Sequence, residues 1–196
     1  MNRVNRATFA VVISLLCLAC SITALPNTRK IDVSRSSLKV RVYKTGFFSA
    51  FAHNHEIEAP IKSGELKESD GPSIELRIDA GKMRVLDPEE SEDKRAQIQR
   101  TMQGAQVLDC DRFPEIHFQS TAVEPRETDH WVVHGNLNLH GQNHPVTVDV
   151  TFKDGLYRGS ATLKQTGFGI TPVSIAGGTV KVKDEVKVEF QISLVK

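Results

Sequence analysis

The chain has 196 residues, of which 39% are hydrophobic and 25% are charged. Its 25 Lys and Arg residues balance 24 Asp and Glu residues, which excludes both the basic footprint of a nucleic-acid-binding protein and the acidic excess of a disordered chain. The length and the apolar content suit one compact domain with a single core.

The first residues have the pattern of a secretory signal peptide. Arg3 and Arg6 make the start basic, and an uncharged, largely apolar stretch runs from Ala7 to Ala24. We expect a signal peptide over residues 1–24, cleaved near Ala24, and a mature domain over residues 25–196 that is periplasmic or secreted. Two alternatives stay open. One is a retained membrane anchor, and the other is a lipoprotein anchored through Cys20, where Leu18-Ala19-Cys20 matches part of a lipobox.

Beyond the leader, the dominant hydrophobic period is two. Five segments alternate apolar and polar residues as antiparallel strands with one wet face do: 38–43, 74–79, 131–140, 146–152 and 186–194. Five weaker strand candidates cover residues 53–59, 61–66, 114–123, 156–165 and 179–183. Turn sequences such as Asp70-Gly71, His140-Gly141 and Asp154-Gly155 separate the segments. This pattern predicts an all-β fold, either a sandwich or a closed barrel.

One segment has a helical pattern instead. Asp87 is placed to be the N-cap, with Pro88 at the first helical position and Glu90 completing a capping box. The following residues present a narrow apolar stripe, formed by Ile98, Met102 and Ala105. We predict a helix of about four turns that ends near Gly104. We expect its stripe to seal one end of a barrel, with ligand contact as the alternative.

Several landmarks, taken in order, resemble the YceI family of exported lipid-binding domains. They are Ile31-Asp32, Ser36-Ser37, Arg112–Ser120 (RFPEIHFQS), Gly135–Val146 (GNLNLHGQNHPV) and Gly167–Ile170 (GFGI). The resemblance covers most of the mature chain. It implies a lipocalin-like antiparallel barrel of about eight strands with one inserted α-helix. It also implies that the interior holds a polyisoprenoid or other long lipid chain, such as a quinone tail.

The chain departs from the family pattern at two places. Family members commonly carry Arg-Asp and Leu in the helical region and then paired aromatics, where this chain has Asp93–Ala96 and Gln106–Leu108. A Gly-containing strand is usual where this chain has Phe51–His55. Both departures fall where a barrel mouth is expected, so the identity of the lipid stays open.

The apolar strand faces are the main functional candidate. The interior of a barrel with this strand number is either filled by side chains or holds one slender ligand, and the resemblance favours the ligand. The expected lipid cavity is lined by Val40, Val42, Leu76, Ile78, Ile116, Phe118, Trp131, Val133, Leu137, Val148, Val150, Phe168 and Phe190. A prenyl tail gains about 0.8 kcal/mol for each buried CH₂, so no charged anchor is needed. The expected partner is therefore a lipid, with peripheral membrane association as a further expectation and the oligomeric state left open.

Trp131 is the only tryptophan, and its parity matches that of Val133, Leu137 and Leu139. Its ring should therefore point inward, near one end of the barrel because it starts a strand. Two roles stay open for it: lining the entrance or plugging the end.

A metal-binding or redox function is the alternative from a different class. His53 and His55 are two residues apart, so on a strand they face the same side about 6–7 Å apart and could share zinc or copper. A third ligand would have to come from Glu56 or another histidine, namely His117, His134, His140 or His144. We favour hydrogen-bonded histidines at a barrel rim over a metal site.

Catalysis is not expected, because motifs for acyl transfer, phosphate loops and dinucleotide binding are lacking. Cys110 is the only cysteine of the mature chain, and Asp109 and Asp111 flank it, which should raise the thiol pKa. We therefore expect a binding protein that is not an enzyme and that uses no cofactor.

Overall fold

A computed structural model of the chain describes residues 28–45, 54–175 and 180–195. These residues form one antiparallel sheet and one α-helix, α1 (Glu92–Gln103). Eight strands are long: β2 (Ser37–Thr45), β4 (Ile61–Lys67), β5 (Ser73–Asp79), β7 (Glu115–Glu127), β8 (His130–Leu139), β9 (Gln142–Lys153), β10 (Leu156–Lys164) and β12 (Val180–Ile192). Four strands are short: β1 (Thr28–Lys30), β3 (His55–Glu58), β6 (Arg84–Val85) and β11 (Ser174–Ile175). Two 3₁₀ turns, η2 (Ala80–Lys82) and η3 (Gln165–Phe168), complete the fold.

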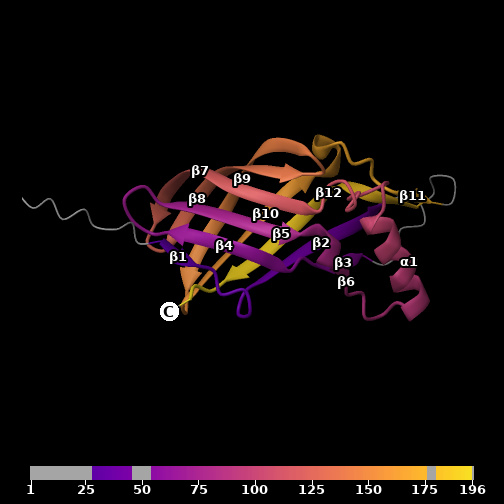
Figure 1. Cartoon of the computed structure of the whole chain (residues 1–196), viewed down its shortest axis with the longest axis horizontal. Helices are drawn as coiled ribbons and strands as arrows, with labels where there is room; N and C mark the ends of the chain where they lie inside the picture. The colour runs from indigo at the N-terminus through magenta and orange to yellow at the C-terminus, as the bar shows by residue number, and fades with distance from the viewer. Residues whose placement is uncertain (1–27, 46–53, 176–179, 196) are drawn as a thin grey trace, which may run out of the picture.

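The sheet curls around a long axis, with α1 at one end and the C-terminus at the other (Figure 1). The strand order is β1-β4-β5-β7-β8-β9-β10-β12-β2-β3-β6, and β11 pairs with β12. The chain after β1 also joins the chain after β12. The backbone N–H of Asp32 donates to the carbonyl of Ser193 at 2.8 Å, and that of Val195 donates to the carbonyl of Lys30 at 2.9 Å. These bonds link the β1–β4 side of the curled sheet to the end of β12.

The structure confirms the all-β, barrel-like fold with one inserted helix. The strand count is higher than the predicted number of about eight, because the sheet has 12 strands in the described residues. The additional strands are β1, β3, β6 and β11, which are only two to four residues long and too short to show alternation. Of these, β3 falls within the weaker strand candidate over residues 53–59. The segments predicted over 179–183 and 186–194 are one strand, β12, whose pairing with β2 shifts register between Val182 and Val186.

Tight turns join the central hairpins. His140-Gly141 connects β8 to β9, and Asp154-Gly155 connects β9 to β10. All four residues have positive φ, from 52° to 76°. Type I′ turns require this at both central positions, and their twist matches that of the flanking strands.

The helix begins later than predicted. Its N-cap is Ser91, whose hydroxyl accepts from the N–H of Lys94, and its C-cap is Gly104. Asp87 is not the N-cap, because its carboxylate is used by β3, where it accepts from the N–H of Glu56 at 2.8 Å. None of the helices in the described residues is long and apolar enough to span a membrane.

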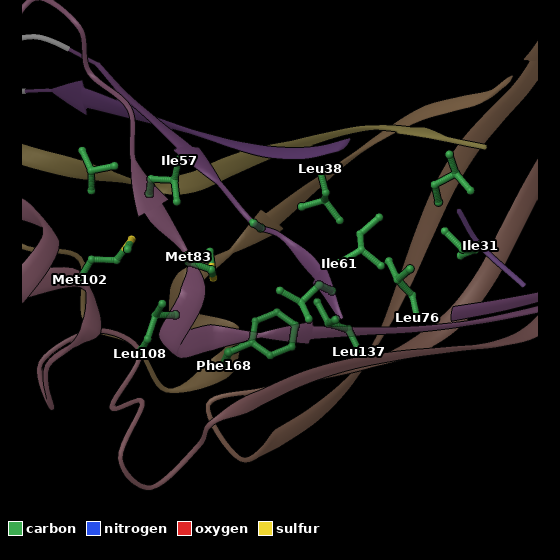
Figure 2. Close-up of a cluster of buried hydrophobic side chains, with 14 of the residues drawn as sticks. Ile31, Leu38, Ile57, Ile61, Leu76, Met83, Met102, Leu108, Leu137 and Phe168 are labelled. Atoms are coloured by element: carbon green, nitrogen blue, oxygen red, sulfur yellow. The ribbon is translucent and has the colours of Figure 1, made fainter. Parts of the chain in front are cut away.

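A cluster of buried apolar side chains fills part of the sheet interior (Figure 2). Figure 2 shows Met83, Met102 and Leu108 at one end of this cluster, with Ile31 and Leu76 toward the other. Glycines let large rings lie flat against the wall. A Cβ on Gly135 would collide with the ring of Phe118 and a backbone carbonyl.

Candidate functional site

An apolar cavity of about 300 Å³ lies inside the curled sheet. This volume is at the lower end of the range of ligand pockets, which is about 300–1,000 Å³. Among the described residues, all but five of those that line the cavity are apolar; the five are Lys67, Glu68, Ser73, Tyr157 and Gln165. The wall of this cavity therefore offers mainly apolar surface and few polar contacts.

The alternation of the strands places the wall residues. Val40 of β2 lies opposite Ile57 of β3 on one side and Val188 of β12 on the other, and all three face the cavity. The outward positions beside them, such as Arg41 and Glu189, carry charge. Each strand thus contributes one apolar face to a common interior, as period-two patterning requires.

Of the thirteen residues expected to line a cavity, the structure places twelve in its wall: Val40, Val42, Leu76, Ile78, Ile116, Phe118, Trp131, Val133, Leu137, Val148, Val150 and Phe190. Phe168 does not line the cavity. It follows β10 in the 3₁₀ turn η3, is 4% exposed, and packs edge-to-face on His144 with ring centroids 5.3 Å apart.

Other wall residues were not predicted from the sequence. Many of them lie on strands whose alternation is clear, such as Ile74, Val186, Val188 and Ile192, so the same parity would have found them. Others come from irregular chain near α1, such as Met83, Val107 and Leu108, and no periodic signal marks them. In the predicted stripe, Met102 is buried and lines the cavity, whereas Ala105 lies beyond the helix end and is exposed. The helix therefore contributes to the wall as well as covering that end.

Trp131 faces inward, as its parity predicted, and its ring lies 6.2 Å from that of Tyr157. Tyr157 also contacts Phe152, with ring centroids 4.7 Å apart. These rings are only partly buried, so this aromatic group borders the cavity where it approaches solvent.

Polar groups meet beside these rings. The hydroxyl of Tyr157 donates to Glu68 Oε1 at 2.7 Å, and Arg29 Nη1 donates to Glu68 Oε2 at 3.3 Å. Burial, and then the hydrogen bond to Glu68, raise the pKa of Tyr157 well above its usual value, so its phenol stays protonated.

His55 lies toward the end of the sheet that carries α1, on the inward side of β3 and opposite Val42. Its Nδ1 is 2.5 Å from Oδ2 of Asp87, and the side chain of Asp87 is 4% exposed. Because Asp87 also accepts from the N–H of Glu56, this carboxylate ties β3 to the chain that leads into α1.

The histidines do not form a cluster in the part of the chain that the structure describes. His53 lies outside the described residues. The candidate third ligands have other partners. Glu56 pairs with Lys39 and Arg41. His117 pairs with Glu75, and His134 contacts Thr147 and Glu124. His140 lies 3.1 Å from the carbonyl of Phe168, whose ring contacts His144. Within the described ranges, no group of three His, Cys, Asp or Glu residues could hold a metal ion.

Charges gather on the outer face of the sheet. Lys187 and Arg41 donate to Glu189 at 2.8 and 2.7 Å, and these bonds lower the pKa of Glu189 to about 2. Arg41 also pairs with Glu56 at 3.1 Å. This is the solvated side of the strands, on the opposite face from the cavity.

Cys110 lies just after α1 and is partly buried. Burial, and then the carboxylates of Asp111 and Asp109, raise the pKa of its thiol. That shift is the opposite of the one that activates a cysteine nucleophile.

Comparison with known proteins agrees with this geometry. Residues 30–194 match the family described as YceI-like domain. The fold is similar to that of BcnA from Burkholderia cenocepacia, with a TM-score of 0.64 and 19% sequence identity over 85% of this chain and 99% of that one. A YceI protein from Campylobacter jejuni is also similar, with a TM-score of 0.48 and 14% identity over 71% of this chain and 81% of that one. No curated protein matches the sequence.

Proposed function

The chain belongs to the family of YceI-like domains, and on this premise we propose that it is a non-catalytic binding protein that holds an isoprenoid or other long-chain lipid inside its barrel. The observation that carries the proposal is the apolar cavity of about 300 Å³, whose wall is built from the inward positions of the strands.

The apolar chemistry of the lining supports a flexible hydrocarbon. Apolar residues from β2, β3 and β12 on one side face those from β5, β7 and β8 on the other. Since each buried CH₂ contributes about 0.8 kcal/mol, a tail of several isoprene units would bind well without an ionic contact. No observation in the described residues favours the metal-binding or redox alternative.

Export is part of the proposal and rests on the leader. We propose that residues 1–24 direct the chain to the periplasm or outside the cell, where it would carry or store its lipid near a membrane. The intact mass of protein from the cell envelope tests this. A chain that begins after Ala24 supports cleavage by a signal peptidase, whereas an acylated chain that begins at Cys20 would make the protein a lipoprotein.

Fluorescence of Trp131 tests the binding itself. Its ring lines the cavity, so a prenylated quinone should quench its emission in a saturable, one-to-one manner. Replacing the small wall residue Ala161 with Phe should reduce this uptake, because the larger side chain would occupy the cavity and the close-packed wall around it cannot take up the extra volume. Thr162→Phe, one position along β10 on the exposed face, is the matched control. Quenching that does not saturate, or that Ala161→Phe leaves unchanged, would contradict the proposal.

A further inference from the structure

The polar atoms of the cavity wall are concentrated at one end, and this asymmetry defines an orientation for the ligand. We propose that a lipid binds with its head at Glu68 and Tyr157, and that this head is a neutral hydrogen-bond donor such as an alcohol or a phenol. This inference deepens the proposed function and rests on it.

Two of the five polar wall residues converge directly. Glu68 and Tyr157 are 89 residues apart in sequence, yet the phenol of Tyr157 donates to Glu68 at 2.7 Å. The side chain of Glu68 is 28% exposed, so this end of the cavity communicates with solvent. A polar head placed here can keep part of its hydration. At the α1 end it would meet Met83, Met102 and Leu108, each buried, and the polar pair there, His55 with Asp87, is closed on itself at 2.5 Å.

The other three polar wall residues either hydrogen-bond to the backbone or lie near the β4–β5 loop. Lys67 donates to the carbonyl of Asp70 within the β4–β5 loop, and Ser73 begins β5 just after that loop. Gln165 uses its amide nitrogen to hold the carbonyl of Lys183 at 2.8 Å. The Glu68–Tyr157 pair is therefore the part of the wall best placed to satisfy a head group.

The direction of the existing hydrogen bonds determines which head fits. The one proton of the phenol is given to Glu68, so the Tyr157 oxygen has only acceptor capacity left for a ligand. The carboxylate of Glu68 is an acceptor as well. A hydroxyl can donate to these oxygens, whereas a quinone carbonyl or an ether offers no proton.

The carboxylate at this end disfavours an anionic head. The carboxylate of Glu68 lines the cavity and would repel a phosphate or a fatty-acid carboxylate. The two nearby cations are already engaged. Arg29 donates to Glu68 and, through Nη2, to the carbonyl of Val195 at 3.0 Å, and Lys67 donates to the carbonyl of Asp70. An anion would therefore have to displace existing bonds, while a neutral donor adds one.

Three probes with the same tail separate these possibilities: geranylgeraniol, its methyl ether and geranylgeranyl monophosphate. Their affinities are measured by displacement of an apolar fluorescent dye from the full mature chain. We expect the alcohol to bind roughly tenfold or more tightly than the ether and the monophosphate, since it alone donates to a carboxylate without adding charge.

Glu68→Gln should reduce this preference by weakening binding of the alcohol and strengthening that of the monophosphate. Glu65→Gln removes the same charge from the exposed face of β4 and should leave the preference unchanged. Tyr157→Phe is a second test, because it removes one of the two acceptors while keeping the ring. Of the three probes, the alcohol should lose the most affinity for this variant.

The outcomes are distinct. Equal binding of alcohol and ether, or monophosphate binding as tight as that of the alcohol, would overturn the proposed head group while leaving lipid binding intact. Failure of all three probes to displace the dye would contradict the proposed function itself.

Discussion

The side-chain amide of Gln99 pairs with the backbone around Val85 as a neighbouring strand would. Its Oε1 accepts from the N–H of Val85 at 2.8 Å, and its Nε2 donates to the carbonyl of Met83 at 2.7 Å. One turn later, Gln103 donates to the carbonyl of Gly81 at 2.7 Å. Helix α1 thus covers β6, the last strand in the order of the sheet, and satisfies backbone groups that an edge strand would otherwise expose.

Gln99→Leu tests this attachment. The substitution leaves the N–H of Val85 and the carbonyl of Met83 without their partners, so we expect it to lower the free energy of unfolding by about 1–3 kcal/mol. Amide hydrogen exchange in α1 and β6 should accelerate more than in β8. Gln97→Leu, at an exposed position of the same helix, is the control. Equal effects of the two substitutions on both measurements would show that the amide pairing contributes nothing.

Gly135→Ala tests the close approach of β8 to a cavity ring. A methyl group here would collide with Phe118 and with the carbonyl of Gln119, so the ring would have to move into the cavity. We expect a loss of about 1–3 kcal/mol in stability, measured by urea denaturation, together with weaker lipid uptake. Gly167→Ala is the control, because the space around that glycine is open. Wild-type stability and uptake for Gly135→Ala would contradict the packing described here.

Glu189→Gln tests the ion pairs on the outer face. Because folding lowers the pKa of Glu189 from 4.5 to about 2, its contribution to stability is present above pH 4.5 and is lost as the pH falls toward 2. The free energy of unfolding of the variant should therefore lie below that of the wild type near neutral pH, and the two should converge in acid. Glu185→Gln, an exposed carboxylate of the same strand, serves as the control. A gap between wild type and Glu189→Gln that stays constant down to about pH 2 would contradict the assignment.

The alternation of apolar and polar residues anticipated most of the sheet, because each long strand has one buried and one wet face. It could not reveal β6 or β11, which are two residues long and exist through their pairing with β3 and β12. The capping pattern at Asp87 misplaced the start of α1, whose N-cap is Ser91. Asp87 has every local feature of an N-cap, but a tertiary partner, the backbone of Glu56, takes its carboxylate.

The candidate site likewise contains residues that the sequence pattern placed and residues that only the tertiary structure brings together. Parity placed residues such as Val40 and Trp131 in the cavity wall, since facing is a local property of a strand. Phe168 is buried in the core without lining the cavity, and it lies in a 3₁₀ turn, where strand parity does not apply. The pairing of Glu68 with Tyr157 joins two loop-proximal residues distant in sequence, and only the closed topology brings them together.

Native mass spectrometry of the protein purified from its own cell envelope tests the central claim most directly. We expect a folded chain that carries one lipid, released on activation as a neutral molecule with a long hydrocarbon tail. The same protein, delipidated, should take up one geranylgeraniol per chain. Recovery of empty protein alone, with no uptake of added lipid, would contradict the assignment of the cavity as a lipid-binding site.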